Sequence, residues 1–121
     1  MATVSIAIHE VKELKVSSIA LDKADLYVKV STGRTNSVRT KTMKNAGKEA
    51  TFEETLQMKW SPGEDLKFEV SDDDKLRRDD DIGTAILTSS MFAQETWTGE
   101  LAITHHDKKT GVVRASVKVI T

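Results

Sequence analysis

The aspartate-rich stretch at residues 71–81, called the acidic loop here, is the segment most suited to chemistry. Its sequence, SDDDKLRRDDD, holds six aspartates in eleven residues and lies between two candidate strands, as a surface loop does. Crowded carboxylates repel one another, so the arrangement costs stability unless solvent, basic side chains or a hard cation offsets the charge. Calcium suits such loops because it takes about six to eight oxygen ligands in flexible geometry. The acidic loop therefore predicts a calcium site, with a solvated acidic surface as the simpler interpretation.

The acidic loop does not match the EF-hand, the helical calcium-binding loop. Counting from Asp72 places Leu76 and Arg77 where an EF-hand needs a ligand and its turn glycine. No helical pattern flanks the loop either. Calcium would have to be bound by the loops of a different fold.

Catalytic chemistry has no candidate in the sequence. No serine lies in a Gly-x-Ser-x-Gly turn, no glycine-rich loop could hold a nucleotide, and the Glu53-Glu54 pair has no convergent nucleophile or histidine. His105 and His106 are adjacent, so we expect them to point apart as a loop pair without an acid at ligand spacing. The sequence predicts a binding protein and not an enzyme.

The segments on either side of the acidic loop, and most of the rest of the chain, are predicted to be strands, because apolar residues alternate there with polar or small ones. The candidate strands are residues 4–8, 26–30, 37–42, 51–58, 66–70, 82–87, 96–103 and 115–119. Residues 89–95 are the only helix candidate, with Ser89 or Ser90 as the N-cap, and a turn is expected over 107–111. This pattern predicts an all-β, eight-stranded antiparallel β-sandwich, as one domain over residues 1–121.

The composition of the chain limits the classes of partner that it can bind. The 121 residues are 38% hydrophobic and 31% charged, without cysteine, and the net charge of -1 lacks the basic excess of a nucleic-acid binder. No apolar stretch approaches the roughly 20 residues that span a bilayer, so we expect a cytoplasmic protein. The charge is unevenly distributed: residues 22–48 hold seven Lys/Arg against two Asp, whereas 49–81 hold twelve Asp/Glu against five Lys/Arg.

Together these segments resemble the C2 domains, calcium-dependent phospholipid-binding β-sandwiches as in protein kinase C. DLYVKV at 25–30 is similar to the family's DPYVKV, RTKT at 39–42 resembles the strand that follows, and TFEETL at 51–56 is similar to its WNExF segment. The family's last calcium loop has the pattern Asp, one residue, Asp, five residues, Asp, two residues, Gly. The chain matches it with Asp72, Asp74, Asp80 and Gly83.

The resemblance implies a calcium site built from two loops at one end of a Greek-key sandwich. Its first loop departs from the family, because two residues separate the aspartates where five are usual and Leu26 replaces a proline. We expect Asp73, Asp79 and Asp81 to be solvated, because alternation along an extended loop points them away from their neighbours. The implied ligands, for one or two calcium ions, are Asp22, Asp25, Asp72, Asp74 and Asp80.

The resemblance also implies reversible binding to the surface of anionic phospholipid membranes. Within the acidic loop, Leu76 is expected to enter the interface, and Arg77 and Arg78 to reach the lipid head groups.

A second surface follows from strand alternation. If strands 26–30 and 37–42 are neighbours in register, an aromatic and three cations converge on one outward patch that suits phosphate oxygens. This basic face, which matches a phosphoinositide-binding cluster of some C2 domains, consists of Tyr27, Lys29, Arg39 and Lys41. The simpler interpretation is a solubilising strand face.

Two functions are therefore expected from the sequence. The first is calcium-dependent membrane binding by a monomer that targets itself or a larger protein. The alternative is a calcium-independent module that uses the same sandwich to bind a protein partner or a phosphoinositide. The first depends on the aspartates, and the second on Lys29, Arg39 and Lys41.

Overall fold

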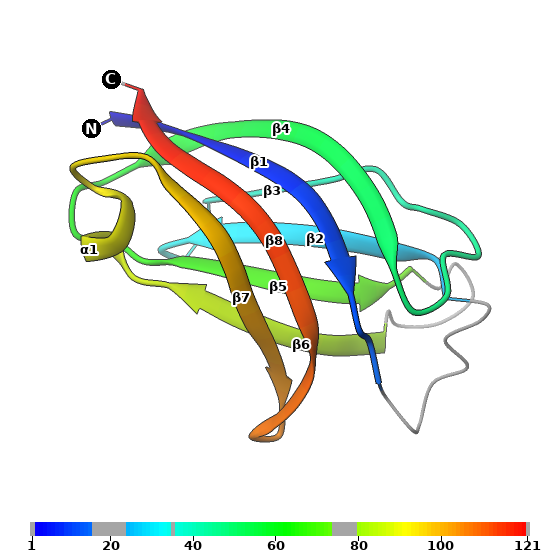
Figure 1. Cartoon of the computed structure of the whole chain (residues 1–121). Coiled ribbons are helices and arrows are strands. Elements are labelled where there is room, and N and C mark those ends of the chain that lie inside the picture. The colour runs from blue at the N-terminus through cyan, green and yellow to red at the C-terminus, as the bar shows by residue number, and fades with distance from the viewer. Residues whose placement is uncertain (1, 16–23, 35, 74–79, 121) are drawn as a thin grey trace.

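Eight antiparallel strands and one short helix form the parts of the chain that the computed structural model describes, residues 2–15, 24–34, 36–73 and 80–120 (Figure 1). No helix within these ranges is long and apolar enough to cross a membrane. The elements are β1 (Ala2–Lys12), β2 (Leu26–Thr32), β3 (Asn36–Arg39), β4 (Ala50–Trp60), β5 (Leu66–Asp72), β6 (Asp80–Leu87), α1 (Ser89–Phe92), β7 (Trp97–His105) and β8 (Lys108–Ile120). The predicted all-β class is confirmed.

The strands form two layers, as the sandwich prediction requires. Their order is β3-β2-β5-β6-β7-β8-β1-β4, and the β6–β7 junction is paired only at Thr84 and Thr104. Strands β3, β2, β5 and β6 make one layer, and β7, β8, β1 and β4 make the other (Figure 1). On the far side Asn36 Nδ2 donates to the carbonyl oxygen of Lys59 at 3.1 Å, which ties β3 to β4. The chain ends lie side by side at one end of the sandwich; the opposite end, where β2 begins and β5 ends, is called the apical end here (Figure 1).

Alternating apolar side chains fill the space between the layers. Val4, Ile6 and Ile8 of β1 are fully buried, as the period of two predicts. The same alternation buries Leu26, Val28 and Val30 of β2 and Leu66, Phe68 and Val70 of β5. This core holds β2 and β5 side by side, so it fixes the two segments that carry the predicted ligands.

The predicted strand 37–42 is shorter than expected, because β3 ends at Arg39. The Thr40 hydroxyl accepts the Val28 N–H at 3.0 Å and so takes the place of a backbone carbonyl in the ladder. Pairing resumes at Met43, which forms a bridge with Leu26.

Two local predictions were wrong. The helix predicted over 89–95 is present, but it spans only Ser89–Phe92, and its N-cap is Thr88 rather than Ser89 or Ser90. The first helical amide, Ser89 N–H, donates to Asp65 Oδ1 at 2.8 Å. The turn expected over 107–111 is a tighter hairpin, in which His106 and Asp107 both have positive φ, 52° and 64°. A two-residue hairpin turn leaves Lys108–Gly111 free to pair as the start of β8.

Candidate metal centre and basic face

Two of the predicted calcium ligands, Asp25 and Asp72, lie next to each other at the apical end. Asp25 directly precedes β2 and Asp72 ends β5, and the register of the two strands pairs Leu26 with Asp72. Asp72 Oδ1 accepts the Asp25 N–H at 2.9 Å, and the Asp73 N–H donates to the carbonyl oxygen of Asp25 at 2.8 Å. These two bonds fasten the first predicted ligand segment to the acidic loop.

A third segment completes this arrangement. The backbone N–H of Asn45 donates to Asp25 Oδ1 at 2.9 Å, so it orients the Asp25 carboxylate. Asp80 begins β6 and its backbone pairs with that of Asp72. The contact with Asn45 was not predicted, because strand alternation carries no information about a hydrogen bond between residues 20 positions apart.

The donors at this end fit a hard cation, because carboxylate oxygens are the ligands that calcium prefers. Asp25 and Asp72 come from segments 47 residues apart, yet they are hydrogen-bonded to each other. Within the described ranges no three His, Cys, Asp or Glu side chains are grouped closely enough to bind a metal ion. Asp22, Asp74 and the side chain of Asp80 lie outside the described residues.

The residues predicted to meet lipid directly are not described either. Leu76, Arg77 and Arg78 fall within residues 74–79, as does Asp79. Asp81 is described, and its side chain is 53% exposed, as expected for a solvated carboxylate.

Asp73 is not the solvated side chain that alternation predicted. Its Oδ2 accepts the Thr42 hydroxyl at 2.9 Å and lies 3.6 Å from a guanidinium nitrogen of Arg39, and its side chain is only 27% exposed. Alternation along an extended loop did not apply, because the bond from the Asp73 N–H to Asp25 sets the direction of the chain at this point.

The structure brings three members of the basic face together, namely Tyr27, Lys29 and Arg39. Lys29 and Arg39 are register partners across β2 and β3, and the Arg39 guanidinium carbon lies 3.6 Å from the centroid of the Tyr27 ring. That distance is a cation–π contact. Tyr27 is buried, with only 8% of its surface exposed, and the Arg39 guanidinium covers its ring. It is therefore not the outward-facing aromatic that the sequence predicted.

Lys41 lies beyond the end of β3. Its backbone N–H donates to the Glu54 carboxylate at 3.0 Å, and its side chain is exposed. Glu69 faces Lys29 from β5 and lies 3.5 Å from Lys67. Acidic side chains therefore border the basic face, and it is less strongly positive than the sequence pattern implied.

The sequence profile of the C2 domain family matches residues 2–116, which is nearly the whole chain. The chain belongs to the C2 domain family. C2 domains are typically binding and targeting modules, and they often bind calcium. None of the curated proteins compared with the chain matches it.

Solved structures support the same fold. The C2A domain of a plant extended synaptotagmin 1 is 17% identical, with a TM-score of 0.83 over 98% of this chain and 93% of that one. A C2 domain-containing protein from a putative elicitor-responsive gene is 20% identical, with a TM-score of 0.78 over 95% and 85% of the two chains. Human GIVD cytosolic phospholipase A2, in complex with an inhibitor and terbium chloride, is 14% identical with a TM-score of 0.78, and this chain spans 17% of its length.

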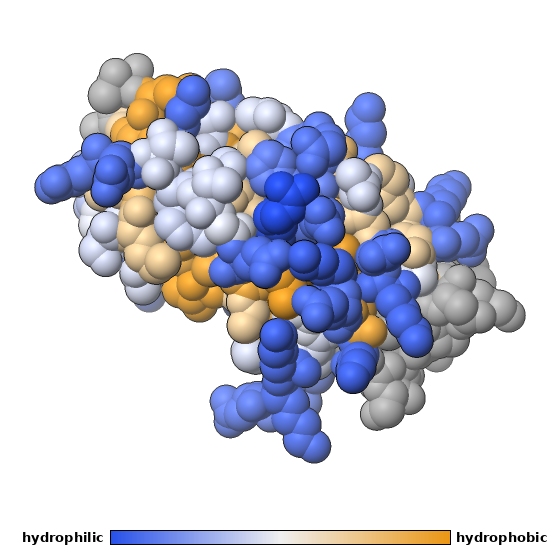
Figure 2. Space-filling model, viewed as in Figure 1, coloured by the Kyte–Doolittle hydropathy of each residue, from blue (hydrophilic) through white to orange (hydrophobic). Residues whose placement is uncertain are grey.

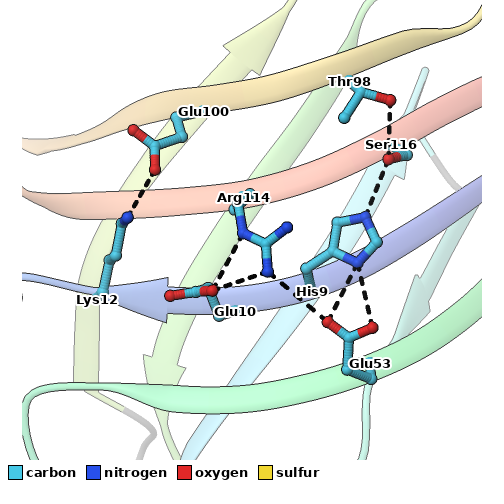
Figure 3. A network of polar contacts seen from close by, with 8 residues as sticks. All are labelled: His9, Glu10, Lys12, Glu53, Thr98, Glu100, Arg114 and Ser116. Carbon is cyan, nitrogen blue, oxygen red and sulfur yellow. Dashed lines mark hydrogen bonds and ion pairs between the residues drawn. The ribbon is translucent and has the colours of Figure 1, made fainter.

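The outer face of the β4-β1-β8-β7 layer of this C2 domain carries a polar network that the sequence did not reveal (Figure 3). Hydrophilic side chains gather across this face (Figure 2). The Lys12 ammonium donates to Glu100 at 2.7 Å. This hydrogen bond, together with the opposite charges, lowers the pKa of Glu100 and raises the pKa of Lys12. Arg114 donates twice to Glu10 Oε2, at 2.8 and 3.0 Å.

Glu53 was wrongly expected to lack a partner histidine. His9 Nδ1 lies 3.2 Å from Glu53 Oε1, while His9 Nε2 lies 2.9 Å from Ser116 Oγ, which is 3.0 Å from Thr98 Oγ1 (Figure 3). A β-bulge at His9 brings these groups together, and Glu53 opposite it has a φ of 44°. Alternation of apolar and polar residues does not reveal a bulge, so this contact could not be predicted from the sequence.

This acid, histidine and serine chain resembles a hydrolase triad in order but not in surroundings. Ser116 lies in a central strand whose backbone is paired on both sides, with Ala7 and with Thr98. Amides engaged in the ladder cannot form an oxyanion hole. Glu53 is also 58% exposed. The chain of hydrogen bonds therefore orders the sheet surface, and it adds no candidate for catalysis.

His105 and His106 do not point apart as expected. Their ring centroids are 4.0 Å apart, because the positive φ of His106 turns the backbone at the hairpin. His105 Nδ1 also lies 3.9 Å from Asp81 Oδ2, although the sequence suggested no acid nearby.

Proposed function

We propose that this C2 domain binds anionic phospholipid membranes in a calcium-dependent manner and so targets itself, or a larger protein that contains it, to the membrane. The observation that carries the proposal is the hydrogen bond between Asp72 Oδ1 and the Asp25 N–H. It joins the backbone of Asp25 to the carboxylate of Asp72, so it brings two aspartates from distant segments together at one end of the sandwich. Both stand in positions that resemble the family's calcium ligands. Family membership supports the membrane as the partner.

The proposed ligand set is Asp22, Asp25, Asp72, Asp74 and Asp80, for one or two ions. Segments 22–25 and 72–81 together hold eight aspartates against four Lys/Arg, a net charge of −4. Bound calcium would supply positive charge that offsets this repulsion toward anionic lipid and would offer coordination positions to lipid phosphates. The protein's own carboxylates hold the site, and the amide of Asn45 orients Asp25.

The remaining attraction would come from side chains around this site. We assign Leu76 to the membrane interface and Arg77 and Arg78 to head groups, with the basic face adding long-range attraction. A protein of this kind would be a monomeric, cytoplasmic, reversibly membrane-associated module.

Sedimentation with phosphatidylserine or phosphatidylcholine vesicles, each in calcium and in chelator at physiological ionic strength, tests the proposal. Wild-type protein should pellet only with phosphatidylserine in calcium. Asp72→Asn should abolish this, because the amide keeps the Oδ1 acceptor for the Asp25 N–H but removes the charge. Asp81→Asn removes one charge from an exposed neighbour and should retain binding.

Calcium should also raise the melting temperature of the wild type, since an ion that binds only the folded loops stabilises by mass action. Asp72→Asn should lose most of this increase. Equal pelleting in calcium and chelator, or calcium-dependent pelleting of Asp72→Asn, would refute calcium-dependent binding through these aspartates.

The alternative function, calcium-independent binding of a phosphoinositide or protein partner, is favoured by one contact. Arg39 is stacked on Tyr27 beside Lys29, which holds the guanidinium on the surface of β2 and β3. Binding of this kind would survive chelator and Asp72→Asn, and it would be lost in a Lys29→Ala, Arg39→Gln variant.

A further inference from the structure

Arg39 of the basic face is joined to the acidic loop through one carboxylate and one hydroxyl. Arg39 Nη2 donates to Thr42 Oγ1 at 2.7 Å and lies 3.6 Å from Asp73 Oδ2. The Thr42 hydroxyl in turn donates to the same Asp73 oxygen at 2.9 Å. The three groups close a small ring, so Asp73 is held in contact with the cation that a phosphate would use.

The Arg39 guanidinium is more exposed to solvent than the Asp73 carboxylate. The Arg39 side chain is 44% exposed and that of Asp73 is 27% exposed. Arg39 lies over Tyr27, and its Nε donates to the carbonyl oxygen of Thr40 at 3.3 Å. The guanidinium is therefore held in place and open to solvent on one side, while its charge is partly neutralised by Asp73.

We propose that Asp73 is an intramolecular competitor for Arg39, which a phosphomonoester group must displace when it binds the basic face. This inference rests on the proposed function, because the competition between Asp73 and phosphate regulates the basic face of the same membrane-binding protein. A phosphate dianion offers bidentate acceptors in the geometry that a guanidinium prefers, so it replaces a single carboxylate oxygen.

The position of Asp73 links this competition to calcium. Asp73 follows the proposed ligand Asp72 directly, and its N–H donates to the carbonyl oxygen of Asp25. A cation held by Asp25 and Asp72 attracts the neighbouring Asp73 carboxylate and weakens its hold on Arg39. Coupling of this kind is reciprocal, so phosphate bound at Arg39 raises the affinity for calcium by the same factor.

The wild type and a set of variants test the competition in chelator, where only the basic face acts. The probe is a phosphatidylcholine vesicle containing phosphatidylinositol 4,5-bisphosphate, and soluble inositol trisphosphate tests whether the free head group competes. Asp73→Asn should tighten vesicle binding about two- to fivefold, the range expected for releasing a partly exposed ion pair. Asp81→Asn removes an equal charge from the same end of the molecule without touching Arg39, and it should change binding less than twofold.

Thr42→Val and variants in an Arg39→Gln background separate release of Arg39 from a general charge effect. Thr42→Val removes the bridging hydroxyl without changing any charge, and it should tighten binding in the same direction as Asp73→Asn. In an Arg39→Gln background Asp73→Asn should have no effect beyond that of Asp81→Asn. Thr42→Val also keeps the test informative if Asp73→Asn unfolds the loop.

The inference is overturned if Asp73→Asn gains no more than Asp81→Asn, or if the same gain appears in the Arg39→Gln background. It is supported further if the vesicles lower the midpoint of a calcium titration in the wild type and not in Asp73→Asn. The proposed function fails separately, by loss of calcium-dependent binding to phosphatidylserine. Competition by soluble inositol trisphosphate supports head-group recognition, and its absence with normal vesicle binding assigns the phosphate to the lipid surface.

Discussion

Replacing Gly83 with alanine should destabilise this C2 domain strongly, although it adds only one methyl group. Gly83 is buried in β6 at the junction of the two layers. A Cβ there would lie 2.6 Å from Ile103 Cγ2, 2.6 Å from Thr110 Oγ1 and 2.9 Å from the carbonyl oxygen of Thr104. Contacts this short do not occur with real Cβ atoms, so the strands must move apart.

The size of the effect follows from two contributions. Overpacking in a core costs about 1–3 kcal/mol. The Thr110 hydroxyl donates to the carbonyl oxygen of Ile82 at 3.0 Å, and displacing it loses a buried hydrogen bond worth about 1 kcal/mol. The sum is roughly 2–4 kcal/mol. With an unfolding entropy of about 2.1 cal/mol/K per residue, the 121 residues convert this to a decrease of roughly 8–16 °C in melting temperature.

Thermal and urea unfolding monitored by circular dichroism measure this decrease. Gly99→Ala is the matched control, because Gly99 lies in β7 and its Cβ would meet only the Trp97 ring, at 3.1 Å. We expect Gly99→Ala to change stability by less than about 1 kcal/mol. Equal stability of the two variants would refute the argument that close approach of β6 and β7 requires glycine at position 83.

Two further predictions concern the polar network on the outer face of the second layer. Glu100→Gln should destabilise the protein slightly at neutral pH and low salt. Because folding lowers the pKa of Glu100, that difference should disappear as the pH falls through the lowered pKa, which urea unfolding across the acid range would reveal. Ser116→Ala removes the hydroxyl between His9 and Thr98, so it should cost about 1 kcal/mol and lower the melting temperature by roughly 4 °C. A variant as stable as the wild type in either case would show that the network adds no stability.

The sequence determined the strands and the way they face. Alternation alone placed Leu26, Val28 and Val30 in the core, because a period of two fixes which side chains share a face of a sheet. The sequence also suggested that β2 and β3, the two strands with basic side chains, are neighbours. Lys29 does pair with Arg39 across them. The spacing of the acidic loop, from Asp72 to Gly83, carried the resemblance to the C2 family that the profile match confirms.

Only the tertiary structure decided the contacts that depend on departures from regular pairing. The bulge at His9 brings Glu53 and Ser116 to one histidine, and the Thr40 hydroxyl ends β3 early. The backbone N–H of Asp73 donates to the carbonyl oxygen of Asp25, and this bond positions the Asp73 carboxylate next to Arg39. Local patterns assume ideal strands, and they carry no information about hydrogen bonds between residues far apart in the chain. Where a polar side chain replaces a backbone partner, the surrounding fold sets its direction, and the sequence by itself does not.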